Sequence, residues 1–124
     1  TTTRPGTTTT TTKATTTAPP TTTSTTPAPT PSTITVTARD LSYQYPEGFS
    51  RDFTVVAGSK IRFDNIEGNN GTEHSFTIPD VWDSGRIDAN DGTKTSPELQ
   101  PGVYNYSCKV TGHSVTMYGT ITVQ

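Results

Sequence analysis

The sequence predicts an all-β protein, a Greek-key antiparallel β-sandwich of about seven or eight strands preceded by a disordered Thr/Pro-rich stalk. Three observations support this. Apolar and polar residues alternate in several short segments after residue 33, which is the period of a strand with one wet face. Turn-forming Gly, Pro, Asn and Asp separate these segments, and no helical pattern of ten residues lies between them. Residues 1–33 show neither pattern.

Residues 1–33 form the expected stalk. They contain 19 Thr and 6 Pro, two cations, and no acidic, aromatic or large aliphatic residue. Such a segment cannot bury enough apolar surface to offset the entropy of ordering its backbone. Thr-rich stretches with Pro are typical of extended, O-glycosylated stalks outside the cytoplasm; the alternative is a plain linker without sugar. Sequons at Asn70 and Asn105 fit a periplasmic, cell-surface or secreted glycoprotein.

Residues 34–124 carry nearly all the aromatic and branched aliphatic side chains, so we expect them to form one folded domain. Seven Lys and Arg against eleven Asp and Glu give this part a net charge of -4, which argues against a nucleic-acid partner. No run of eighteen apolar residues occurs, and Thr1 begins neither a signal peptide nor a transmembrane helix. We expect a removed export signal or a larger parent chain, with the stalk as a tether to a membrane or cell wall.

The first two expected strands lie on either side of two turns. Residues 34–38 (ITVTA) alternate apolar residues with Thr, and residues 60–66 (KIRFDNI) place Ile61 and Phe63 opposite charged residues. The sequences Pro-Glu-Gly and Ala-Gly-Ser between them are turn signals. Both segments are therefore predicted to be strands with one buried face.

Three more strands are predicted further along the chain. Residues 74–78 (HSFTI) place their His on the same face as Phe and Ile, and residues 103–108 (VYNYSC) place two Tyr and the Cys on one face. Residues 119–123 (GTITV) close the domain. A helix, if present, is expected within 79–92, where the alternation lapses.

The stretch CKVTGHSVTM, residues 108–117, contains the only Cys, the only Met and one of the two His of the chain. Cys108 ends an expected strand, and His113 and Met117 lie on the loop before the last strand. The other histidine, His74, begins an earlier strand. These four residues are the whole Cys, His and Met content, and we predict that they form one metal site.

The donor types favour copper. A thiolate and two imidazoles, with a thioether at longer distance, suit an ion that alternates between Cu(I) and Cu(II). A structural zinc site takes four strong ligands, and a thioether is a poor one. Iron–sulfur clusters need several Cys, and a two-copper centre needs a second Cys, which the chain lacks. One copper ion is the expected cofactor, although a lone Cys or Met is ordinarily a core residue.

Other candidate sites are weaker. The segment DANDG (88–92) resembles a calcium loop, but that alignment places Ile87 and Ala89 at ligand positions, so a polar turn is expected. A Ser/His/acid catalytic arrangement is not expected because both histidines are assigned to the metal, and we predict that the protein is not an enzyme. The larger aromatic residues are expected in the core, and Trp82 in either the core or a loop.

The stretch CKVTGHSVTMYGTITV (108–123) resembles the ligand loop of azurin-type blue-copper proteins: Cys, four residues, His, three residues, Met, one residue, Gly, then the last strand. Upstream, FTVVAGSKIRFDN (53–65) and EHSFTIP (73–79) are similar to the segments that precede and carry the first His in small cupredoxins, including the plastocyanin and auracyanin groups. The resemblance covers residues 53–123 and leaves out the stalk. It implies a cupredoxin-like sandwich.

The resemblance also implies roles for individual residues. By this resemblance the equatorial copper ligands would be His74, Cys108 and His113. The weak axial ligand would be Met117. The backbone carbonyl of Glu73 stands where azurin supplies a second distant axial oxygen, although azurin has Gly there. Ser75 stands where the family commonly has an Asn that ties the two ligand loops together, and the shorter side chain is expected to do this less well.

The function implied is type 1 (blue) copper electron transfer. The partners would be redox proteins met transiently, such as a cytochrome, a membrane oxidase or another copper protein. They would dock on an apolar patch around the outer edge of one copper-binding His, composed of Gly112, His113, Val115, Val110 and Pro79. Two alternatives are a copper-binding or delivery module and the copper domain of a larger multicopper protein. A surface adhesion domain would leave the four candidate ligands unexplained.

Overall fold

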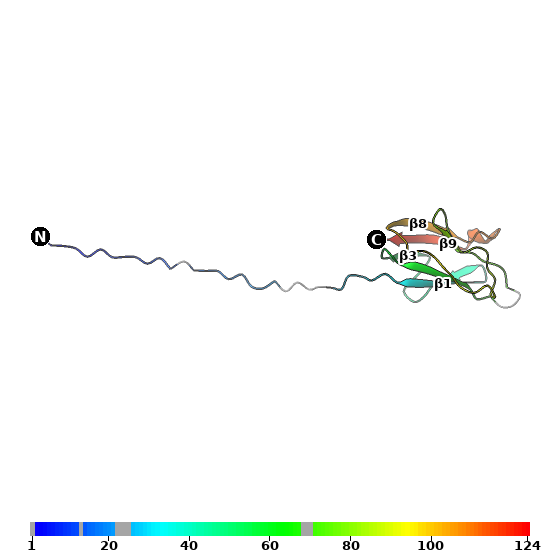
Figure 1. Ribbon diagram of the computed structural model, residues 1–124, viewed down its shortest axis with the longest axis horizontal. Coiled ribbons are helices and arrows are strands. Elements are labelled where there is room, and N and C mark those ends of the chain that lie inside the picture. Colours follow the sequence, from blue (N-terminus) through cyan, green and yellow to red (C-terminus); the bar gives the residue numbers. More distant parts are fainter. Residues whose placement is uncertain (1, 13, 22–25, 68–70) are drawn as a thin grey trace.

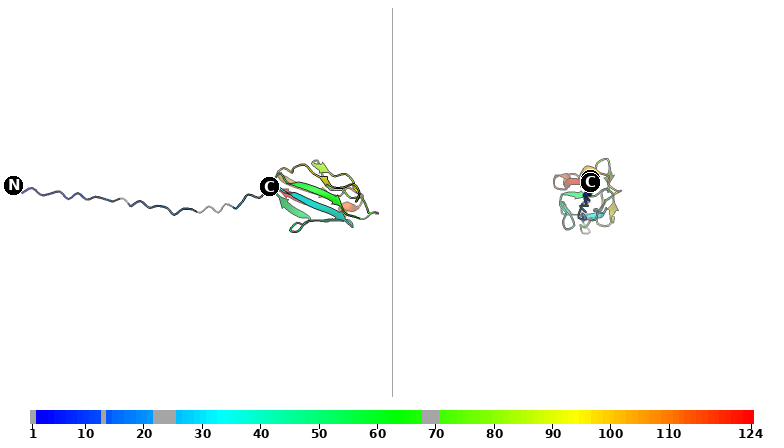
Figure 2. Two further views of the ribbon diagram at one scale, coloured as in Figure 1. Left: turned by 60° about the horizontal axis from the view of Figure 1, so that its bottom comes forward. Right: turned by 90° about the vertical axis from the view of Figure 1, so that its left-hand side faces the viewer.

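The computed structural model describes residues 2–12, 14–21, 26–67 and 71–124. Two β-sheets pack face to face in the C-terminal part of the chain (Figure 1, Figure 2). The first sheet has the order β2-β1-β4-β7 and the second β3-β9-β8-β5-β6. The strands are β1 (Thr33–Arg39), β2 (Ser42–Gln44), β3 (Asp52–Val55), β4 (Lys60–Asn65), β5 (Thr77–Ile78), β6 (Trp82–Asp83), β7 (Lys94–Thr95), β8 (Gly102–Ser107) and β9 (Tyr118–Val123). The predicted all-β sandwich is confirmed.

The sheets are mixed, which corrects the expectation of antiparallel pairing throughout. β1 pairs parallel with β4 in the first sheet, and β3 pairs parallel with β9 in the second. Parallel neighbours cannot be joined by a two-residue hairpin. Both parallel pairs accordingly join strands that are not consecutive, because the chain crosses between the sheets before it returns to the same one.

The core lies between the sheets and follows the predicted alternation. Ile34, Val36 and Ala38 of β1 are buried, while the Thr residues between them are exposed or half-buried. Phe76 and Tyr106 stack at the centre, with ring centroids 4.4 Å apart and planes 14° apart. At roughly 1.5–3 kcal/mol for each large buried apolar side chain, this core is the main source of stability.

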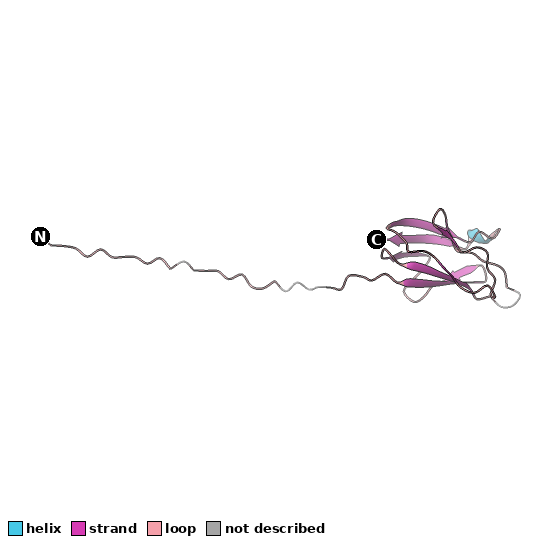
Figure 3. Ribbon diagram, in the orientation of Figure 1, coloured by secondary structure: helices cyan, strands magenta, loops and turns pink. Residues whose placement is uncertain are grey.

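The structure differs from the expected elements after β4. Of the expected strand 74–78 only Thr77–Ile78 is regular, and His74 forms an isolated bridge with Ile87. The segment 79–92, where a helix was allowed, contains β6 instead. Within the described residues the one helical element is the 3₁₀ helix η1 (His113–Val115), shown in Figure 3. No helix in the described ranges is long and apolar enough to cross a membrane.

The described residues before Pro31 are exposed and belong to no helix or strand (Figure 1). Packing against the sandwich begins at Pro31 and Ser32. The backbone N–H of Ser32 donates to Ser59 Oγ at 3.1 Å, and the N–H of Lys60 donates to the Ser32 carbonyl at 3.0 Å. Asn105 is exposed on β8, whereas the sequon at Asn70 lies outside the described residues.

Candidate metal centre

The ligand loop, residues 108–117, connects β8 to β9. The N–H of Cys108 donates to the Met117 carbonyl at 2.9 Å, which closes the base of the loop. The N–H of Met117, just after η1, donates to the carbonyl of His113, the first residue of η1, at 2.8 Å. Gly112 precedes η1 with φ of 83°, a left-handed conformation that glycine adopts without steric cost. These local bonds hold the backbones of Cys108, His113 and Met117 close together on one short loop.

His74 reaches the same place from the segment just before β5, the strand that pairs with β8 in the second sheet. Its N–H donates to the Ile87 carbonyl at 3.0 Å, and the N–H of Ile87 donates back to the His74 carbonyl at 2.9 Å. Two residues further on, Phe76 is fully buried in the core. The bridge fixes the backbone at His74, the buried ring of Phe76 fixes it two residues later, and the His74 side chain is buried.

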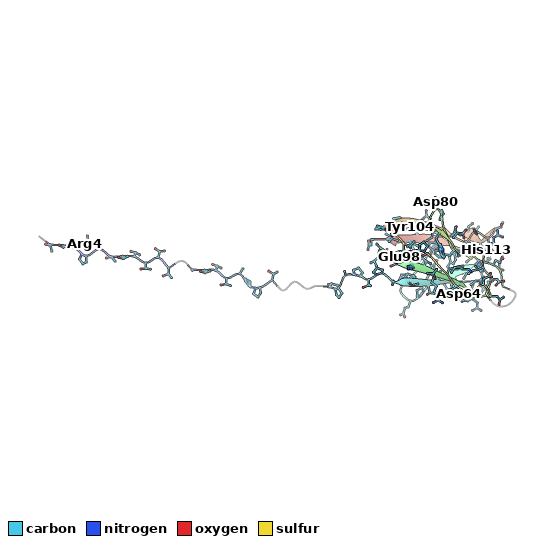
Figure 4. All side chains as sticks on the ribbon, viewed as in Figure 1. Arg4, Asp64, Asp80, Glu98, Tyr104 and His113 are labelled. Carbon is cyan, nitrogen blue, oxygen red and sulfur yellow. The ribbon has the colours of Figure 1, made fainter. Side chains whose placement is uncertain are left out.

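The side chains of His74, Cys108 and His113 converge in a buried cluster. One donor atom from each lies within 4.8 Å of the others. His113 Nδ1 is 3.2 Å from His74 Nδ1 and 3.6 Å from Cys108 Sγ. His74 and Cys108 are fully buried, and His113 is 8% exposed. Figure 4 labels His113 at the end of the sandwich opposite the N-terminal segment. The structure thus assembles the three strong donors that the sequence predicted.

The cluster fits a metal ion by its spacing and by its chemistry. Two donors that are each about 2.0–2.3 Å from one ion in a trigonal arrangement lie roughly 3.5–3.8 Å apart, close to the observed separations. Lone pairs of two imidazoles and a sulfur that face one point repel each other unless a cation or a proton lies between them. Cys108 forms no disulfide, so its sulfur is available for coordination.

The protonation of His74 also suits a metal ligand. Burial lowers the pKa of His74, and His113 lowers it further, although the Glu67 carboxylate opposes both effects. A lowered pKa keeps the imidazole neutral at pH 7, which is the form that donates a lone pair. Partial burial would raise the pKa of Glu67, but the backbone N–H groups of Asp40 and Thr72, together with His74, hold it below its ordinary value.

Ser75 ties the two ligand-bearing segments together. Its backbone N–H donates to Cys108 Sγ at 3.3 Å, and its Oγ accepts the N–H of Lys109 at 2.8 Å. The hydroxyl of Tyr43 donates to the Ser75 carbonyl. The shorter side chain therefore does bridge the two segments, by accepting a backbone N–H from the residue after the cysteine.

The two candidate axial groups belong to residues whose backbone adjoins the cluster residues. Met117 is fully buried, and its backbone is bonded to both Cys108 and His113. Glu73 directly precedes His74 and is exposed to solvent. Their roles as axial donors stay predictions.

The residues of the predicted docking patch differ in their exposure and surroundings. Gly112 and Val115 are exposed beside His113, and Val115 is 76% exposed. Val110 is half-buried and packs against the core. Pro79 lines a hollow of about 460 Å³ together with Arg51, Tyr118 and neighbouring residues of the second sheet. The apolar surface next to His113 is therefore centred on Val115.

Two residues near the cluster were missed in the sequence. Glu67 lies with its Oε2 3.5 Å from His74 Nε2. Leu41 is 48% exposed, and its carbonyl accepts the Thr116 hydroxyl at 2.7 Å, so the Asp40–Leu41 turn lies against the ligand loop. Neither residue belongs to a motif, since both reach the site through long-range packing. The signal that the sequence offered for Glu67 was an acidic residue seven positions before His74.

No protein-family model matches the chain, and no curated protein sequence matches it. Solved structures do match. Auracyanin A, a "blue" copper protein from Chloroflexus aurantiacus, is 21% identical, with a TM-score of 0.57 over 77% of this chain and 100% of its own. Dithionite-reduced auracyanin from Roseiflexus castenholzii is 17% identical, with a TM-score of 0.59 over 78% of this chain and 99% of its own.

A chain of a heme-copper terminal oxidase dimer is also similar, with 18% identity and a TM-score of 0.57 over 76% of this chain and 65% of the oxidase chain. At these identities the matches establish the fold. The two packed sheets and the buried His-Cys-His cluster agree with it. The sandwich of this protein has the cupredoxin fold, as its resemblance in sequence implied.

Proposed function

We propose that this protein is a type 1 (blue) copper electron-transfer protein that holds one copper ion between His74, Cys108 and His113. The observation that carries the proposal is the convergence of two imidazole Nδ1 atoms and one thiol sulfur in a buried cluster, at 3.2 and 3.6 Å. Met117 is the proposed weak axial ligand, and the Glu73 carbonyl the proposed distant axial oxygen. The cupredoxin fold, shared with a "blue" copper protein, supports the assignment.

Bound copper would supply one-electron chemistry by alternating between Cu(I) and Cu(II). The protein's part is to keep the donors in one arrangement through that change. The closed ligand loop, the His74–Ile87 bridge and the Ser75 contacts hold them in place before a metal binds. Rigid donors limit rearrangement on electron transfer, and four protein ligands leave no position for a substrate, so the proposed role is a carrier and not an enzyme.

Electrons are proposed to enter and leave through His113. The residue is 8% exposed and lies next to Gly112 and the exposed Val115. A small, weakly polar contact around it, extended by Val110 and Pro79, suits a transient encounter with a cytochrome, a membrane oxidase or another copper protein.

Residues 1–33 are proposed to be a stalk and residues 34–124 the copper domain. β9 ends at Val123, and η1 lies at the opposite end of the sandwich from the C-terminus and from the side where the stalk enters (Figure 3). In polyproline-like extension the stalk would span about 100 Å. A stalk anchored to a membrane or cell wall, with or without glycans, would then present His113 away from its anchor, outside the cytoplasm.

Two alternatives give different results in solution. A copper-delivery module would release its ion readily, and such proteins favour exposed Met or His clusters, whereas the ligands here are buried. A copper domain cut from a larger multicopper protein would have further metal sites elsewhere in the parent chain. The similarity to a heme-copper oxidase chain, of which 65% is covered, favours testing this second alternative. The test is to read the sequence of the full gene product.

The test is an optical and paramagnetic resonance spectrum of the oxidised, copper-loaded protein. An intense visible thiolate-to-copper band is expected, with loss of the band in Cys108→Ser. Ser114→Ala, an exposed change in the same loop, is the control and should keep the band. A wild-type protein that stays colourless after loading and oxidation would overturn the proposal. Rapid loss of copper to a mild chelator would favour the delivery module.

A further inference from the structure

The outer nitrogen of His74 is the one buried polar side-chain atom without a hydrogen-bond partner among the described residues. His74 Nε2 is fully buried, and no side chain or backbone group among the described residues forms a hydrogen bond with it. The Oε2 atom of Glu67 lies 3.5 Å away. The Glu67 side chain is only 12% exposed, and that of His74 is not exposed at all. A carboxylate thus faces the far side of a predicted metal ligand.

The Glu67 carboxylate is held in this orientation by two loops. Oε1 accepts the backbone N–H of Asp40 at 2.5 Å, and Oε2 accepts that of Thr72 at 2.6 Å. Asn65 supports the arrangement, since its Oδ1 accepts the Glu67 N–H at 3.0 Å and its Nδ2 donates to the Thr72 carbonyl at 2.9 Å. Short bonds from N–H groups to a charged acceptor are strong. The carboxylate is therefore fixed before any metal binds.

The tautomer of His74 explains what the carboxylate is for. His74 Nδ1 faces His113, so Nδ1 is the atom that donates to a metal. A neutral imidazole that donates through Nδ1 carries its proton on Nε2. A buried N–H without an acceptor is unfavourable, and metal-bound histidines ordinarily donate this proton to a carboxylate, a carbonyl or water. Glu67 is the group in position to accept it.

We propose that Glu67 is a positioning residue of the copper centre: it accepts the Nε2 proton of His74, fixes the imidazole with Nδ1 toward the metal, and places one negative charge beside it. This inference rests on the proposed function. Glu67 is not one of the four predicted ligands, and it lies outside the segments 53–65, 73–79 and 108–123 that resemble those of cupredoxins.

The charge of Glu67 is expected to lower the reduction potential of the copper. Cu(II) with one thiolate and two neutral imidazoles leaves one positive charge in a buried site, which a single nearby carboxylate balances. With Cu(I) the same site carries one negative charge in excess. An excess negative charge is unfavourable in a low-dielectric site. Glu67 therefore favours the oxidised state and lowers the reduction potential.

Three variants separate the effects of charge and hydrogen bonding. Glu67→Gln keeps one acceptor oxygen and removes the charge, whereas Glu67→Ala removes both. Asp40→Asn is the matched control, because it removes an exposed charge in the adjoining turn and leaves the backbone N–H that binds Glu67 in place. Asn also tolerates the left-handed φ of 49° at this position.

The measurements are the reduction potential by voltammetry, Cu(II) affinity by competition with a chelator, and circular dichroism of the copper-free proteins to verify folding. Glu67→Gln should raise the potential well above that of Asp40→Asn. Glu67→Ala should also weaken Cu(II) binding by about tenfold or more. A crystal structure of the copper-loaded wild type should show Nε2 within about 2.7–3.2 Å of Oε2.

The outcomes distinguish this inference from the proposed function. A wild-type protein without the visible band overturns the copper assignment itself. A blue wild type whose Glu67→Gln and Glu67→Ala variants match Asp40→Asn in potential and affinity overturns the role of Glu67 alone. Variants that lose only thermal stability, with an unchanged potential, show a purely structural carboxylate and also overturn it.

Discussion

The backbone nitrogen of Ser75 lies 3.3 Å from Cys108 Sγ, and its N–H donates to that sulfur. The Ser75 hydroxyl accepts the backbone N–H of Lys109, the residue after Cys108, at 2.8 Å. One residue thus contacts the sulfur and fixes the backbone beside it. The contact joins the segment that carries the first histidine to the loop that carries the other candidate ligands. It makes Ser75 the point where the two halves of the site are held in register.

We predict that Ser75→Ala destabilises the copper-free protein by about 1 kcal/mol, because the N–H of Lys109 loses its acceptor while the N–H to Cys108 Sγ is kept. The measurement is the free energy of unfolding in urea. Ser114→Ala, at an exposed position of the ligand loop, serves as the comparison and should change it little. Equal values for the two variants would show that the Ser75 hydroxyl does not tie the loops together.

Electron exchange through His113 can be tested on the exposed valines. Val115 is 76% exposed beside His113, and Val103 is 71% exposed at the other end of β8–β9, where it pairs with Thr122. Val115→Asp places a like charge between two copies that meet through this surface, and it should slow electron self-exchange by about tenfold or more. The check is the self-exchange rate from nuclear magnetic resonance line broadening.

Val103→Asp adds the same charge to the protein at a distance from η1. It should leave the self-exchange rate within a small factor of the wild type, and both variants should keep the visible spectrum. Slowing of the same size in both would point to net charge, and no slowing in Val115→Asp would remove this surface as the electron portal.

Acid should weaken the contact between β6 and the ligand loop. Partial burial would raise the pKa of Asp83, but the Lys109 ammonium, the Gly85 N–H and the Thr77 hydroxyl hold it below the ordinary value of 3.8. A carboxyl whose pKa is lower in the folded state contributes stability above the unfolded value. This contribution is lost as the pH falls through the lowered folded value.

We therefore expect the unfolding free energy of the copper-free protein to fall more steeply below about pH 4 in the wild type than in Asp83→Asn. Lys109→Gln should flatten the same part of the profile, because it removes the cation that contacts Asp83. The measurement is urea unfolding at a series of pH values. Parallel profiles for all three proteins would contradict the assignment.

The sequence was sufficient for the local part of the site. Within residues 108–117 a fixed spacing places Cys108, His113 and Met117 on one strand connection, and their backbone bonds are local. The alternating strands around residues 34–38 and 60–66 were predicted nearly to their ends, because one buried face forces a period of two. The rare residue types then indicated copper by their donor chemistry alone.

Only the tertiary structure decided the contacts between distant segments. The parallel pairing of β1 with β4, the bridge from His74 to Ile87 and the approach of Glu67 to His74 depend on how the chain crosses between sheets. A periodic pattern states which face of a strand is buried and carries no information on which distant strand lies beside it. The sequence thus determined which atoms could bind a metal, and the packing of the sheets determined which of them meet and what lies behind them.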